Sequence, residues 1–345
     1  MSTVLLVGAG EVGVRAARQL VDTPGVERVL VASRDRARAA DVAAVLGPAG
    51  EALSEASPEA GGSVGGDGGR GGDRPVIDGG VAVVAVATTE PRAGEWSAAA
   101  VDAGVPVATI AEGVSSELEA RALTAGVTIA TGCGLAPGLA DVLARHAAAT
   151  FDAVDEVHLA RVGASGGACA ESVRDARRAT PGEWRDGGWR ADRAFGPELL
   201  WFPEPIGARE CQLVKSGVLA AVATVPGARH VTMRHGAPPA TGRFRGWMRR
   251  DPVDEGWGAA RVEVTGWRDG VAGSVVYGVV DRAAVVAGVV LAVAAGALVG
   301  LVDVGLDARA GAAPLGALAA PVPFLHELAR RGVKAAAFEG VVPAS

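Results

Sequence analysis

The sequence predicts an α/β protein in which a parallel-sheet domain is followed by an α+β domain with a mainly antiparallel sheet. Its 345 residues suffice for about two globular domains, and a composition of 49% hydrophobic and 21% charged residues is that of an ordinary folded protein. Residues 1–150 alternate short Val/Ile-rich runs with Ala/Leu-rich stretches, as βαβ units do. We expect domains over residues 1–150 and 151–320. Residues 321–345 should add a helix and a strand that pack back on the first domain.

The elements of the first domain follow from this alternation. Short apolar runs are typical of strands that helices bury on both faces, and they occur at Val4–Val7, Val29–Ala32, Val81–Ala87, Val105–Ile110 and Val127–Ala130. Ala/Leu-rich stretches predict helices at Val12–Val21, Arg36–Leu46, Glu95–Ala103, Ser115–Ala125 and Gly138–Ala149. Residues 57–74 interrupt the pattern with a run of glycines, and this composition predicts a flexible surface insertion.

The second domain is predicted from a different pattern. Strands are expected at Val154–Val162, Val218–Val225, Arg261–Trp267 and Gly273–Val280. The Arg268-Asp269-Gly270 sequence between the last two is typical of a hairpin turn. In the tail, Pro323–Arg331 predicts a helix and Val333–Phe338 an edge strand.

Several features restrict the class of protein. The stretch Ala283–Val302 is uncharged and long enough to span a membrane, but seven Ala and three Gly favour a buried helix instead. The three cysteines lie far apart, and no Cys/His cluster is visible, so we expect neither disulfides nor a metal site. The N-terminus lacks the basic region of a signal peptide, and the net charge of −6 gives no reason to expect nucleic acid. A cytoplasmic protein without a membrane partner is expected.

The strongest motif closes the first predicted strand and opens the first predicted helix. In such a turn the first glycine permits the tight bend, the second lets a pyrophosphate approach the backbone, and the third lets helix and strand pack closely. The phosphates then lie at a helix N-terminus. This context predicts a Rossmann-type nucleotide site over Gly8, Ala9, Gly10, Glu11, Val12 and Gly13.

The end of the second strand indicates which nucleotide binds. NAD sites usually carry an acidic residue there, whereas this chain has Ser33 followed by Arg34. A hydroxyl and a guanidinium suit the 2′-phosphate of NADP. We therefore expect NADP, with NAD the less favoured alternative. The acidic residue Asp35 stands two residues beyond the position that NAD sites use, and it can simply begin the next helix. Arg34 can also be an ordinary surface arginine.

The carboxyl ends of the other parallel strands predict where the substrate binds, because ligands of open parallel sheets lie beyond those ends. Thr88 and Thr89 follow the third predicted strand and Cys133 follows the fifth, and all three are candidate cofactor contacts. Glu112 follows the fourth. The helix that begins near Pro137 could receive a carboxylate or carboxamide at its N-terminus.

The GAGEVG motif, the Ser33-Arg34-Asp35 sequence and above all the stretch Gly132–Leu139 (GCGLAPGL) resemble the saccharopine dehydrogenase-like superfamily. This group includes saccharopine reductases, lysine 6-dehydrogenase and carboxynorspermidine dehydrogenase. The resemblance covers residues 1–150 well and extends more loosely to the later layout. It implies NAD(P)-linked chemistry at a carbon–nitrogen bond, by oxidation of an amine or reduction of an imine.

Hydride transfer to an imine also needs a proton donor and a group that holds the substrate's charge. Glu112 could bind a substrate ammonium or relay a proton, His158 could act as a general acid, and Arg161 could hold a carboxylate. For each of these three residues, a structural or surface role without function is the alternative. We expect an NADP-dependent oxidoreductase, a homodimer, that acts on a small amino or imino compound. The alternative is a non-catalytic NADP(H)-binding regulatory or accessory protein.

Overall fold

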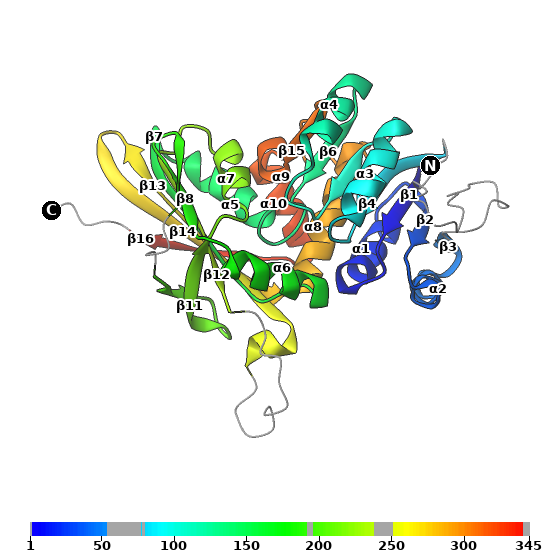
Figure 1. Ribbon diagram of the computed structural model, residues 1–345, viewed down its shortest axis with the longest axis horizontal. Helices are drawn as coiled ribbons and strands as arrows, with labels where there is room; N and C mark the ends of the chain where they lie inside the picture. Colours follow the sequence, from blue (N-terminus) through cyan, green and yellow to red (C-terminus); the bar gives the residue numbers. More distant parts are fainter. Residues whose placement is uncertain (1, 54–76, 78–79, 192–195, 238–250, 341–345) are drawn as a thin grey trace. The chain divides into compact units, whose positions relative to one another are not determined.

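The computed structural model describes residues 2–53, 77, 80–191, 196–237 and 251–340 (Figure 1). The glycine-rich insertion expected at 57–74 lies outside the described residues. The chain forms two compact units, each made of two segments. Unit 1 comprises Met1–Gly134 with Ala287–Glu327, and unit 2 comprises Leu135–Val286 with Leu328–Ser345. These limits differ from the contiguous domains that the sequence suggests.

Unit 1 contains a parallel sheet of seven strands in the order β15-β6-β5-β4-β1-β2-β3. The central strands are apolar and buried at their carboxyl ends, as strands covered on both faces must be. The five strands expected in this half of the chain are present. The strands are β1 (Ser2–Val7), β2 (Val26–Ala32), β3 (Gly50–Leu53), β4 (Val81–Val86), β5 (Val107–Thr109), β6 (Thr128–Thr131) and β15 (Gly311–Pro314).

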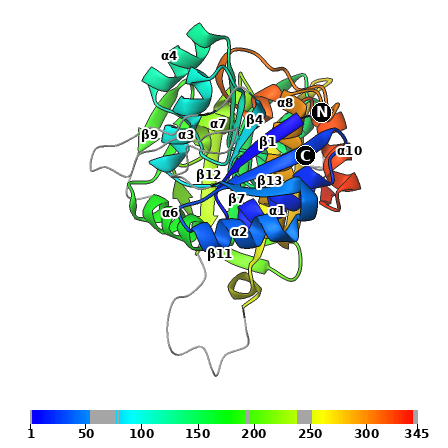
Figure 2. The same ribbon diagram turned by 90° about the vertical axis from the view of Figure 1, so that its right-hand side faces the viewer.

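Helices cover both faces of this sheet. Helices α1 (Glu11–Val21) and α2 (Arg36–Val45) lie on one face, and α3 (Arg92–Asp102) and α4 (Ser116–Ala125) lie on the other (Figures 1 and 2). Ser115 caps α4 by accepting a hydrogen bond from the backbone N–H of Leu118 at 3.2 Å. The remaining helices that contribute to unit 1 are α8 (Ala283–Leu298), α9 (Leu315–Leu318) and α10 (Pro321–Arg330).

Helix α8 forms most of the uncharged segment that the sequence analysis singled out. It packs so closely on α1 that a Cβ added at Gly288 would lie 2.5 Å from Cβ of Arg15. Among the described residues, no helix is long and apolar enough to cross a membrane. The expectation of a buried helix is confirmed, since most α8 side chains have little or no exposed surface.

Unit 2 contains a mainly antiparallel sheet of nine strands, in the order β10-β11-β12-β7-β13-β14-β16. Off this path, β8 pairs with β12 and β9 pairs with β8. Among the described strands of this sheet, β7 and β12 are the one pair that runs parallel. Helices α5 (Leu139–Ala148), α6 (Gly167–Arg178) and α7 (Val218–Thr224) complete the unit. The strands are β7 (Ala153–Val162), β8 (Gly182–Arg185), β9 (Gly188–Ala191), β10 (Glu198–Phe202), β11 (Gly207–Val214), β12 (His230–Gly236), β13 (Trp257–Arg268), β14 (Val271–Arg282) and β16 (Ala335–Gly340).

The predicted hairpin is confirmed. Strands β13 and β14 pair along their whole length, and Asp269 (φ 51°) and Gly270 (φ 77°) take the left-handed conformation of a two-residue turn.

Two predictions about unit 2 are wrong. The segment Val218–Val225 was expected as a strand but forms α7, because Ala-rich sequence favours a helix and Val218 and Ala221 bury one face of it. The C-terminal strand was expected to pack on the first domain, but β16 pairs with β14 in the second sheet.

Candidate functional site

The turn after β1 contains three glycines, and the structure around each one differs. Gly8 has a φ of +106°, and an added Cβ would lie 2.7 Å from the backbone oxygen of Ala87. A Cβ at Gly13 would lie 1.8 Å from the backbone oxygen of Gly8, so this glycine lets α1 pack against the turn. Gly10 is different. Its φ is −79°, and a Cβ added there would have no atom within 4 Å. Packing and backbone conformation therefore require Gly8 and Gly13 but not Gly10.

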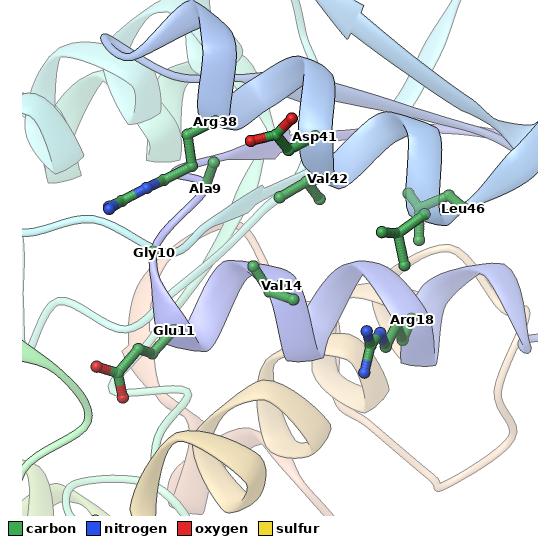
Figure 3. Close-up of a pocket in the computed structure, with 10 residues that line it drawn as sticks. Ala9, Gly10, Glu11, Val14, Arg18, Arg38, Asp41, Val42 and Leu46 are labelled. Carbon is green, nitrogen blue, oxygen red and sulfur yellow. The ribbon is translucent and has the colours of Figure 1, made fainter.

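A pocket of about 380 Å³ lies between α1 and α2, and the glycine turn forms one of its ends (Figure 3). Ala9, Gly10 and Glu11 line it from the turn. Val12 and Gly13, from the same motif, are buried behind it. The remaining lining residues come from the two helices: Val14, Arg18, Arg38, Asp41, Val42, Val45 and Leu46.

The end of β2 carries the residues expected to select the nucleotide. Ser33 is half-buried and Arg34 is exposed, directly after the last residue of the strand. Asp35 caps α2, because its carboxylate accepts a hydrogen bond from the backbone N–H of Arg38 at 3.0 Å. Arg38 itself extends along the pocket toward Gly10 (Figure 3). Arg38 was not among the residues singled out from the sequence, although it lies in the first turn of α2, close along the chain to Arg34.

The neighbouring strand ends place the other candidates at the same edge of the parallel sheet. Thr88 and Thr89 follow β4, which pairs directly with β1, and both are half-buried. Glu112 follows β5 and is exposed. Cys133 follows β6, but its side chain has no exposed surface, and its thiol donates to the backbone oxygen of Ala130 at 3.3 Å. Burial raises the pKa of Cys133 to about 12, so this thiol is a packing group and not a nucleophile.

His158 and Arg161 both lie on β7 but on opposite faces of the sheet. They are three residues apart, and side chains alternate between faces along a strand. Two candidates that the sequence analysis assigned to one reaction therefore lie on different surfaces of unit 2.

Arg161 belongs to a group that we call the Arg161 cluster, formed by the half-buried Arg161 and Arg177 and the buried His235. Arg161 donates to the backbone oxygen of Ala136 at 2.8 Å and to that of Gly163 at 3.2 Å. His235 lies opposite Arg161 in the β12–β7 register. Arg177, from α6, donates to the backbone oxygen of His235.

The Arg161 cluster contains more positive charge than its neighbours neutralise. His235 is 2% exposed, and within the described parts of the chain neither of its ring nitrogens has a hydrogen-bond partner. The same holds for Nε of Arg161. Burial and the charges of Arg161 and Arg177 hold the pKa of His235 well below its ordinary value. No described carboxylate forms an ion pair with either arginine, so the arrangement suits a bound anion.

His158 belongs to a second polar group on the other face. Its Nε2 lies 2.9 Å from Oε2 of Glu156, and Nδ1 of His230 lies 3.5 Å from Oε1 of the same carboxylate. These three side chains could together hold a metal ion. From the sequence we expected no metal site. The side chains of this group lie together because the pairing of β7 with β12 brings Glu156 opposite His230, 74 positions along the chain.

Comparison with known proteins supports the fold. The sequence profile of shikimate / quinate 5-dehydrogenase matches residues 1–57. Saccharopine dehydrogenase (L-Glu forming) from Saccharomyces cerevisiae has a similar structure, with a TM-score of 0.69 and 14% identity over 98% of this chain and 100% of that one. A search of curated protein sequences found no match.

More distant structures share less of the fold. A myo-inositol dehydrogenase from Corynebacterium glutamicum has a TM-score of 0.44 and 13% identity over 79% of this chain and 74% of its own. An oxidoreductase from Agrobacterium radiobacter, solved with NAD⁺, L-tartaric acid and magnesium, has a TM-score of 0.45 and 10% identity over 85% and 86%. The two-domain α/β fold of this chain is thus the fold of saccharopine dehydrogenase.

Proposed function

We propose that this chain, on the saccharopine dehydrogenase fold, is an NADP-dependent oxidoreductase that transfers hydride at a carbon–nitrogen bond of a small, carboxylate-bearing amine or imine. The observation that carries the proposal is Gly10. Neither its backbone conformation nor its packing requires a glycine, yet its missing side chain leaves open space at the N-terminus of α1. A pyrophosphate that approaches the backbone there needs this space.

The residues after β2 favour NADP over NAD. The only carboxylate in the Ser33–Asp35 stretch is Asp35, and it is engaged in capping α2. Arg38 lines the pocket and Arg34 is exposed just after the carboxyl end of β2, and guanidinium groups bind phosphate by charge-assisted hydrogen bonds. When bound, the nicotinamide would supply or accept the hydride. Thr88 and Thr89 are proposed as further contacts to the dinucleotide.

The Arg161 cluster supports a substrate that carries a carboxylate. Two arginines and a neutral, buried histidine lie together without a described counter-anion. Arg161 is held by backbone oxygens, which fixes its guanidinium but leaves its charge unneutralised. Glu112 is proposed to bind a substrate ammonium or to relay a proton. His158 lies on the other face of its sheet, and we do not assign it to this reaction.

Arg34→Ala should weaken NADPH binding about tenfold to a hundredfold, because a charge-assisted hydrogen bond contributes about 1.5–3 kcal/mol. NADH lacks the 2′-phosphate, so its affinity should not fall. Titration followed by nicotinamide fluorescence measures both constants. Arg28→Ala is the matched control, since Arg28 is also exposed on β2 but lies toward its amino end and pairs with Glu51. Equal loss of NADPH and NADH binding in Arg34→Ala would contradict the assignment, and failure of the wild-type protein to bind either nucleotide would overturn the proposed function.

Arg161→Met should raise KM for a carboxylate substrate about tenfold or more while NADPH affinity stays unchanged, because only the anion contact is removed. Saccharopine with NADP⁺ is the first probe, followed by a panel of amino and imino acids. Unchanged turnover in Arg161→Met would show that the carboxylate binds elsewhere.

The separation of His158 from Arg161 favours one alternative, a non-catalytic NADP(H)-binding regulator, because it removes a candidate proton donor. Turnover that is lost in a Glu112→Gln variant of intact fold would exclude this alternative. Tight NADPH binding without turnover on any substrate of the panel would support it.

A further inference from the structure

A group of histidine and glutamate side chains on the unit 2 sheet has no part in the proposed reaction. The His/Glu cluster consists of Glu156, His158 and His230, with Glu183 and Thr232 around them. The register of β7 and β12 sets His230 opposite Glu156 and Thr232 opposite His158, so all four lie on one face. Strand β8 brings Glu183 to His230, at 2.9 Å from its Nε2.

Each imidazole in this cluster is oriented by an outer partner. Nδ1 of His158 lies 2.7 Å from the hydroxyl of the buried Thr232, and its Nε2 faces Glu156. Nε2 of His230 is hydrogen-bonded to Glu183, and its Nδ1 faces the Glu156 carboxylate that His158 also contacts. Metal-binding histidines have this arrangement, because a second polar group holds one ring nitrogen and directs the other at the ion.

The spacing of the inward-facing atoms suits a small metal ion. One ligand atom from each of Glu156, His158 and His230 lies within 4.8 Å of the others. With bonds of about 2.0–2.2 Å, tetrahedral ligands lie roughly 3.4 Å apart. His158 Nε2 lies 2.9 Å from Oε2 of Glu156, and His230 Nδ1 lies 3.5 Å from Oε1 of the same carboxylate. The two imidazole rings lie 5.0 Å apart and nearly perpendicular, at 84°.

The accessibility of the cluster also suits a metal ion. The side chains of His158 and His230 are 29% and 14% exposed, so an ion can reach them and a water can occupy a fourth position. One cation competes for the same groups. Arg185 donates to Glu183 at 2.9 Å, and its Nη2 lies 3.1–3.2 Å from the ring nitrogens of His230.

We propose that Glu156, His158 and His230 form a binding site for a divalent transition-metal ion such as Zn²⁺, which cross-links β7 and β12. Two imidazoles and one carboxylate are a ligand set that Zn²⁺ accepts. The site is independent of the nucleotide pocket, since all of its residues lie in unit 2. Glu183 and Thr232 act as positioning residues.

The test uses the full-length protein stripped of metal with a chelator. Titration with Co²⁺, followed by its visible absorption, and with Zn²⁺ against a chromophoric chelator should show one equivalent bound and a rise in melting temperature. His158→Gln and His230→Gln should each weaken binding by at least tenfold, and Thr232→Val should weaken it by about tenfold. Arg185→Ala should tighten binding, because it removes the competing cation.

His326→Gln is the matched control, because His326 is exposed on α10 and should leave binding unchanged. Circular dichroism of the metal-free variants checks that each is folded, and Glu156→Gln replaces any histidine variant that is not. The absence of a stoichiometric site in the wild-type protein would overturn the proposal. Equal affinity in the wild type and in the two histidine variants would overturn it as well.

Discussion

Gly10→Ala is expected to lower the affinity for NADPH about tenfold to a hundredfold while the protein stays folded. The new methyl group meets no protein atom within 4 Å, so it should collide only with a bound pyrophosphate. Alanine is a poorer N-cap than glycine, but the cost should stay within about 1 kcal/mol. Nicotinamide fluorescence measures the affinity, and thermal unfolding measures the stability.

Gly13→Ala supplies the matched comparison, because the same methyl group is added three residues away. Its Cβ would lie 1.8 Å from the backbone oxygen of Gly8, and backbone atoms cannot move aside as a flexible side chain can. We expect the free energy of unfolding to fall by about 3 kcal/mol or more, which corresponds to roughly 6–12 °C in Tm. The two variants thus separate binding from folding. Wild-type NADPH affinity in Gly10→Ala would contradict the placement of the pyrophosphate.

Acidification from pH 7.5 to pH 5 is expected to destabilise the protein through His235. Burial and the nearby charges of Arg161 and Arg177 lower the pKa of His235 below its ordinary value of 6.5. Below pH 6.5 the unfolded chain therefore binds a proton that the folded protein does not bind, and stability falls with decreasing pH. The slope approaches about 1.36 kcal/mol per pH unit until the pH reaches the folded-state pKa, for a loss of up to about 2 kcal/mol by pH 5.

Denaturant unfolding at four pH values within this range tests the prediction. His235→Leu should flatten the dependence, whereas His326→Gln should leave it as in the wild type. Hydrogen bonding to His158 lowers the pKa of Glu156 below 4.5, so the stabilisation from this group is lost only at lower pH. An equally steep dependence in His235→Leu would place the titrating group elsewhere.

The sequence predicts unit 1 well because its elements carry local signals. The apolar strand β1, the glycine turn and the capped helix α2 are all specified by adjacent residues. Strands β3 and β15 were not predicted, because their sequences carry no local strand signal. The Gly311–Pro314 sequence of β15 contains no β-branched residue, and it forms a strand only because β6 offers a partner.

The same distinction applies to the candidate sites. Arg34 could be nominated from the sequence because it stands two residues after a predicted strand. The pairs Arg161–His235 and Glu156–His230 could not, because each joins residues 74 positions apart through the β7–β12 register. Adjacent residues do not specify this register, because it is set only when the two strands pair in the folded sheet. A parallel pair of strands has no hairpin turn between them that would reveal the pairing in the sequence.

Strand β15 has a consequence for biosynthesis. The edge next to β6 is completed by residues 311–314, which leave the ribosome only after most of unit 2 has been made. Until then the nascent unit 1 exposes unpaired backbone along β6 and an uncovered surface on α1, where Gly288 later packs. A premature stop codon before residue 311 therefore removes a strand of the unit 1 sheet together with the C-terminal residues. It leaves β6 in place of β15 as the edge strand of the parallel sheet of unit 1.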